Sequence, residues 1–223
     1  MNGLYLRFAV VWLVSVGLGC TSAPVRYYTL TAPPDKTLPD PEATLTVDVR
    51  IIHTPLPLDR AELMVRTGPT EVTLLENERW ASPVNDEIKD ALRLDLQHRL
   101  GRTTGSHPVF GKLTLDLDVR RLEAELGRNA LMEASWTAAL SVADERSTQD
   151  QPSNAERVTN CIFRADEKIE AGYAGIVEGY QREIVALADA IVAVLKSPAS
   201  GIDAPCQKVI EDSAGGSGRK DHF

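Results

Sequence analysis

Strict alternation of apolar and polar residues runs through three stretches of the sequence. Every second residue is apolar in residues 44–51, 112–119 and 131–142. A period of two is typical of a strand that is buried on one face, whereas buried parallel strands are continuously apolar. The chain is therefore expected to build a largely antiparallel sheet.

Two longer segments have the period of an amphipathic helix. Residues 84–100 carry aliphatic side chains at every fourth position and follow Ser82 and Pro83, which predict an N-cap and a first turn. A longer apolar stripe begins after Gly172 and ends before Pro198. Both helices are expected to pack on one face of the sheet, which gives an α+β domain.

The remaining strands are shorter. Residues 26–31 are rich in β-formers, residues 62–66 and 71–75 flank a Gly-Pro turn as a hairpin, and residues 157–165 complete a meander. Arg120 and Arg121 interrupt the alternation of residues 112–119, which predicts a β-bulge or a strand end there.

The first 19 residues contain one charge, Arg7, and an apolar run that ends at Cys20. The run is shorter than the roughly 20 residues that span a bilayer, and its layout is typical of a secretory signal peptide. Gly19-Cys20 resembles a bacterial lipobox, with Gly17 where that motif usually has leucine. The resemblance implies that Cys20 is acylated, with palmitate among its chains, and Thr21 after it favours the outer membrane. The alternative is an ordinary signal peptide with a chance cysteine.

The chain thus divides into a signal peptide (1–19), one lipid-anchored domain (20–198) and a glycine-rich flexible tail (199–223). Removing the signal peptide removes Arg7 and takes the net charge from −8 to −9. With no Lys/Arg-rich run, this acidic domain is not expected to bind nucleic acid. Its contact with the membrane should come from the acyl chains, because anionic lipid repels it.

No pattern of residues points to catalysis. The four histidines have no metal-ligand spacing, and the sequence contains no HExxH, GxSxG, phosphate loop or GxGxxG motif. Asp116 and Asp118 fit the solvated face of a strand. The chain is expected to be no enzyme, with no metal, no catalytic residue and no cofactor beyond a covalent lipid.

Two cysteines remain after Cys20. Outside the inner membrane the compartment is oxidising, so Cys161 and Cys206 are candidates for a disulfide that ties the tail to the sheet. The alternative is two free thiols.

Five features occur in order along the chain: Cys20, Arg26–Leu30, Leu58–Arg66, Arg79–Pro83 and the helix to Leu100. Together they resemble PqiC-type lipoproteins, also called ABC-type transport auxiliary lipoprotein components, over roughly residues 20–196. The resemblance implies a non-catalytic lipoprotein on the periplasmic face of the outer membrane of a Gram-negative cell. It also implies an MCE-domain protein as partner, with an ABC permease and ATPase in some systems, and a role in moving lipids or other hydrophobic molecules between membranes.

Six residues within these motifs are candidates for docking the partner. Asp59 and Arg60 lie in a proline-stiffened loop, and Arg and Trp are frequent in binding hot spots. The candidates are Tyr27, Tyr28, Asp59, Arg60, Arg79 and Trp80. A purely structural role, as an ion pair or a core plug, is the alternative for each.

Other functional classes are the alternatives. An enzyme would have a concave site with clustered polar groups of perturbed pKa. A structural or assembly lipoprotein, acting as a scaffold or chaperone for outer-membrane proteins, would have no transport role. A direct lipid carrier would need a large apolar cavity. Whether the chain forms a homo-oligomer is left open as well.

Overall fold

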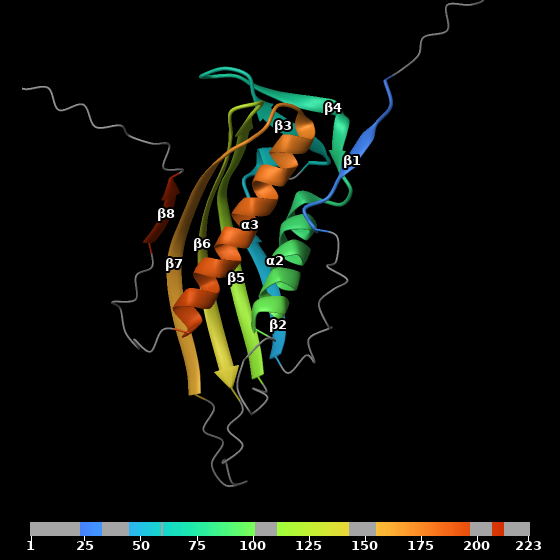
Figure 1. Ribbon diagram of the computed structural model, residues 1–223. Coiled ribbons are helices and arrows are strands. Elements are labelled where there is room, and N and C mark those ends of the chain that lie inside the picture. Colours follow the sequence, from blue (N-terminus) through green and yellow to red (C-terminus); the bar gives the residue numbers. More distant parts are fainter. Residues whose placement is uncertain are drawn as a thin grey trace, which may run out of the picture.

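A computed structural model describes residues 23–32, 45–58, 60–100, 111–142, 155–196 and 207–211, with backbone alone at 45, 57, 142, 155–157 and 207–211. These residues form one sheet and two long helices (Figure 1). The helices are α2 (Val84–Leu100) and α3 (Tyr173–Lys196), with a short 3₁₀ helix, η2 (Leu56–Leu58). The strands are β1 (Arg26–Tyr28), β2 (Leu45–His53), β3 (Glu62–Arg66), β4 (Val72–Trp80), β5 (Gly111–Glu125), β6 (Asn129–Val142), β7 (Ala155–Lys168) and β8 (Gln207–Glu211).

The sheet is mixed, which corrects the expectation of a largely antiparallel one. Its order is β1-β4-β3-β5-β6-β7-β8, and β2 pairs with the first half of β5. The pairs β3–β4, β5–β6 and β6–β7 are antiparallel, whereas β1–β4, β2–β5, β3–β5 and β7–β8 are parallel. The alternation was misleading because β2, although parallel to β5, leaves Thr46 and Arg50 exposed, as an antiparallel strand would.

Both helices lie across the same side of the sheet and contact one another (Figure 1). Helix α2 contacts β2, and α3 contacts β6 and β7. The core lies between these two layers, where the alternating aliphatic residues of β5 are fully buried. No helix in the described residues is long and apolar enough to cross a membrane.

The predicted irregularity at Arg120 and Arg121 is a β-bulge, as the register between β5 and β6 shifts between Val119 and Arg121. The extra residue restores the inward phase, so that Leu122 and Ala124 are again buried. The strand therefore continues to Glu125 instead of ending at the arginine pair.

Helix α3 lies close to the sheet at Gly179. A Cβ atom at this position would lie 2.5 Å from Ile169 Cγ2 and 3.0 Å from the Ala130 side chain. Only glycine fits so close a contact without displacement of these neighbours. The beginning of the helix is thereby held directly on β6.

Two elements extend beyond their predicted ranges. Strand β4 continues from the predicted hairpin to Trp80, through residues expected to form a connection. Within the segment expected to be a flexible tail, Gln207–Glu211 forms β8 and pairs with β7, so this part belongs to the sheet. Five residues are too few for a recognisable alternation, so pairing with the β7 edge was not evident from the sequence.

Candidate functional site

Two of the sequence motifs lie side by side at one edge of the sheet. Strand β1 pairs with the end of β4, so that Tyr27 lies opposite Arg79 and Tyr28 opposite Trp80. The amide of Ala81 extends this contact by donating to the carbonyl of Tyr28 at 2.7 Å. Segments about fifty residues apart in sequence therefore form one local structure.

Glu78 binds two side chains of β1 from a buried position. The Arg26 guanidinium donates to its Oε1 through Nε and Nη2 at 3.0 and 2.6 Å, and the Tyr28 hydroxyl donates to its Oε2 at 2.7 Å. Burial, and then the hydrogen bond to Glu78, raise the pKa of Tyr28, which stays protonated as a donor. Arg26 also lies over the ring of Tyr173, 5.8 Å from its centroid, which adds a contact from α3.

Glu87, in the first turn of α2, is buried and accepts four hydrogen bonds. Its Oε2 receives the Thr29 hydroxyl at 2.7 Å and the Leu30 amide at 2.8 Å. Its Oε1 receives the hydroxyl and the amide of Ser82 at 2.8 and 3.1 Å. Ser82, expected as the helix N-cap, thus donates to Glu87, and the carbonyl of Pro83 accepts the first helical bonds.

We call Glu78 and Glu87, with the groups of residues 26–30 that they bind, the N-terminal clamp. Gln181 of α3 adds a donor to it through the Thr29 carbonyl at 3.1 Å. The sequence analysis missed both glutamates. A signal was present, since Glu78 shares its strand phase with Trp80, and Glu87 lies in the apolar stripe of α2.

Two of the six candidate docking residues point into the domain. Trp80 is 6% exposed, and its ring lies 6.3 Å from that of Tyr180. Tyr28 packs against the core and binds Glu78. Both therefore have structural roles, and Trp80 presents almost no surface to a partner.

The other candidates within the described residues face outward. Tyr27 is 66% exposed, and Arg79 lies beside it and reaches Glu62 of β3 at 3.4 Å. Arg60 is exposed, and the next residue, Ala61, accepts a hydrogen bond from the Trp80 amide. Tyr27, Arg60 and Arg79 are thus brought to one outward-facing surface, which we call the outer row.

Three other predicted site residues, Cys20, Asp59 and Cys206, lie outside the described residues. Cys161 is described. It is buried on the helix-covered face of β7 and is disulfide-bonded.

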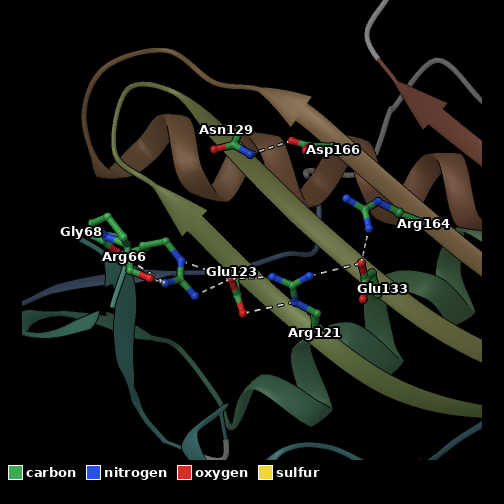
Figure 2. A network of polar contacts seen from close by, with 9 residues as sticks. Arg66, Gly68, Arg121, Glu123, Asn129, Glu133, Arg164 and Asp166 are labelled. Atoms are coloured by element: carbon green, nitrogen blue, oxygen red, sulfur yellow. Dashed lines mark hydrogen bonds and ion pairs between the residues drawn. The ribbon is translucent and has the colours of Figure 1, made fainter. Parts of the chain in front are cut away.

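A network of ion pairs crosses the opposite face of the sheet (Figure 2). Glu123 binds Arg66 at 2.8 Å and Arg121 at 3.1 Å, and Glu133 binds Arg121 at 3.4 Å and Arg164 at 2.6 Å. The pKa of Glu123 is lowered, and the hydrogen bond from Arg121 is the largest cause. Half-exposed pairs of this kind contribute little each, but they satisfy one another's charge and leave a polar, solvated face.

Two hollows in the described residues do not suit a lipid. A cavity of about 20 Å³ beside Trp80 and Tyr180 holds roughly one water molecule. A groove of about 430 Å³ between the ends of α2 and α3 is lined mainly by charged side chains, including Asp95, Arg99 and Lys196. The described residues also contain no cluster of three or more histidine, cysteine or carboxylate side chains that could hold a metal ion.

Comparison with known families is decisive at this point. Residues 28–192 match the model of the ABC-type transport auxiliary lipoprotein component. The chain belongs to this family. The match begins at Tyr28 of the N-terminal clamp and covers both helices almost to the end of α3, so most of the sheet and both helices belong to the family domain, whereas Arg26, Tyr27 and β8 lie outside the matched residues. Members of the family are lipoproteins that serve transport systems, which gives this chain a transport-associated role.

Two solved structures are similar to this chain at low sequence identity, and the first of them shares its fold. An uncharacterized protein has a TM-score of 0.53 and 18% identity, covering 78% of this chain and all of that one. Protein XCC0632 from Xanthomonas campestris, described as a DUF330 member, has a TM-score of 0.46 and 17% identity over 75% of this chain and 92% of its own. No curated protein matches the sequence.

Glu183 is a buried carboxyl of a different kind from those of the clamp. It lies on the sheet-facing side of α3, and among the described residues neither carboxyl oxygen has a hydrogen-bond partner of good geometry. Burial, and next the charges of Glu167 and Asp166 on β7, raise its pKa to about 9, against weaker opposing effects of the Met132 amide and Arg182. The side chain is therefore protonated at neutral pH, which explains how it is tolerated there.

We expect Glu87→Gln to destabilise the domain by roughly 2–3 kcal/mol, because the amide nitrogen cannot accept two of the four hydrogen bonds. Urea unfolding measures the loss, and hydrogen exchange should be faster at the Leu30 amide. Glu76→Gln, at an exposed position of β4, is the control and should change neither quantity. An unchanged unfolding midpoint for Glu87→Gln would contradict the clamp.

Because the pKa of Glu183 is raised, we expect the domain to become less stable as the pH rises. The unfolded chain releases this proton near the ordinary pKa of 4.5, whereas the folded protein holds it to about 9. Between these values the folded state binds the extra proton, so the free energy of unfolding should fall by up to about 1.4 kcal/mol per pH unit.

Denaturant unfolding from pH 5 to about 9 tests this linkage. Glu183→Gln should remove the fall, because the amide does not titrate. Glu178→Gln, at an exposed site on the same helix, should retain it. If Glu183→Gln keeps the slope of the parent protein, Glu183 is not the group responsible.

Proposed function

We propose that this protein is an accessory subunit of an MCE-type transporter, anchored in the outer membrane and facing the periplasm. The transporter would move lipids or other hydrophobic molecules between the membranes and so contribute to envelope integrity. One observation carries the proposal: the segment that follows Cys20 is bound into the domain by buried carboxylates, while the same edge presents Arg60 and Arg79 outward. A chain built in this way joins a membrane anchor to a protein-binding surface.

The anchor would be an acylated Cys20. A single acyl chain gives only marginal membrane binding, so stable anchoring needs more than one chain, palmitate among them. The proposed role needs no cofactor other than this covalent lipid, and it needs no catalysis.

Docking agrees better with the described hollows than direct lipid carriage does. An acyl chain needs an apolar cavity of several hundred cubic ångströms. The cavity beside Trp80 is far smaller, and the groove between α2 and α3 is charged. The hydrophobic cargo would therefore be carried by the MCE-domain partner, with permease and ATPase subunits supplying the energy.

Arg60 and Arg79 are the residues that we assign to docking. Arginine is frequent in binding hot spots, and its guanidinium binds carboxylates in a fixed geometry. Arg79 is held in place by Glu62 and by the Glu76 carbonyl, to which its Nε donates at 3.0 Å. An acidic surface on the partner would complement this pair.

We expect the double variant Arg60→Ala, Arg79→Ala to bind the MCE-domain protein about tenfold more weakly, because both charged contacts are lost. Affinity is measured on purified proteins. Arg93→Ala on α2 is the matched control, since its side chain is 39% exposed and that of Arg79 is 38% exposed.

Equal affinity for the double variant and the control would remove Arg60 and Arg79 from the docking site. Co-purification with an outer-membrane barrel protein instead of an MCE protein would favour the scaffold or chaperone role.

We further propose Cys206 as the disulfide partner of Cys161. The chain has three cysteines, and Cys20 would be consumed by acylation. Cys161 is disulfide-bonded, and β8 begins opposite Ile162, the residue that follows it. Residue 206 precedes β8, so continuing this register leads toward Cys161.

A disulfide between Cys161 and Cys206 would close a loop of about 45 residues and stabilise the domain by about 3–4 kcal/mol in the chain-entropy model. Peptide mapping without reduction should find the two cysteines linked. Replacing both with alanine should lower the unfolding midpoint as far as reduction of the parent protein does. Two titratable thiols in the unreduced, denatured protein would rule the bond out.

A further inference from the structure

The N-terminal clamp leaves little free chain between the proposed anchor and the folded domain. Arg26 is the first residue that the clamp fixes, through Glu78. Six virtual bonds of about 3.8 Å connect the Cα atoms of Cys20 and Arg26, so these atoms are at most about 23 Å apart. If Cys20 is acylated, as the proposed function requires, this short tether keeps β1 near the lipid surface.

The residues that this tether holds there are suited to an interface with lipid. Val25 is 44% exposed and Tyr27 is 66% exposed. Tyrosine is enriched where headgroups meet water, because its ring is apolar and its hydroxyl is polar. No hydrogen bond within the described part of the protein engages the hydroxyl of Tyr27, so it is available to a headgroup.

The charge of this segment is also suitable. Residues 20–34 contain Arg26 and no acid, in a chain that has 32 acidic residues. The side chain of Arg26 is 61% exposed although it binds Glu78. The acidic domain as a whole would be repelled by anionic lipid, so a segment without carboxylates is the part that can lie against it.

We propose that the β1 edge is a membrane-contact surface, with Val25 and Tyr27 in the headgroup layer of the bilayer that holds the acyl chains. The clamp fixes β1 to the rest of the domain, because β1 cannot move away from β4 and α2 without breaking buried hydrogen bonds. Contact of β1 with the membrane would therefore orient the whole domain. Strand β7 lies near the opposite edge of the sheet from β1 (Figure 1), so it is far from the proposed contact.

Fluorescence quenching in vesicles tests the contact. The acylated mature protein, carrying Tyr27→Trp, is incorporated into vesicles of phosphatidylethanolamine and phosphatidylglycerol that contain a lipid spin-labelled near the headgroup. The matched control is Val158→Trp on β7, since Val158 is 63% exposed and Tyr27 is 66% exposed. The native Trp80 and Trp136 are buried, and their signal is subtracted with the parent protein.

We expect the Tyr27→Trp variant to be quenched at least about twofold more than the Val158→Trp variant. A spacer of about ten Gly/Ser residues between Ser22 and Ala23 should bring the two to the same level, because the longer tether releases the edge. Equal quenching in proteins that float with the vesicles would overturn the membrane contact alone. Failure of the proteins to float would overturn the acyl anchor as well.

Discussion

Two buried carboxylates, Glu78 and Glu87, bind the N-terminal segment to the rest of the domain. A short parallel strand of three residues would be marginal without them, because it makes few ladder hydrogen bonds and β1 lies at the sheet edge. The carboxylates supply charged acceptors for the side chains of Arg26, Tyr28 and Thr29 and for the Leu30 amide. Hydrogen bonds to charged groups are stronger than neutral ones, and loss of either carboxylate would strand buried donors.

The local elements of this fold could be predicted from the sequence, but the pairing of the strands could not. Period-two alternation located β2, β5 and β6, and a phase shift located the bulge near Arg120, because both depend on neighbouring residues alone. The parallel pairing of β2 with β5 depends on a crossover through β3, β4 and α2. When one face of a strand is solvated, its residues alternate in the same way whether it pairs parallel or antiparallel, so the sequence does not reveal its direction.

The same limit applied to the candidate site. The segments chosen from the sequence lie together, since Tyr27, Arg60 and Arg79 gather at one edge. It could not separate them from Tyr28 and Trp80, because adjacent strand residues face opposite sides and the direction is set by the partner strand. Glu78 and Glu87 are in phase with core residues, but their role becomes clear only once their donors are known, and those in residues 26–30 lie some fifty residues away.

The clamp also determines how mechanical load would pass through the protein. A pull between a docked partner and a membrane anchor would enter at β1 and be resisted by the contacts of Glu78 and Glu87. Resistance to such a pull is governed by the rate at which this small unit opens, and not by the equilibrium stability of the whole domain. If the envelope stretches and relaxes, the contacts of these two side chains would therefore break before the hydrophobic core unfolds.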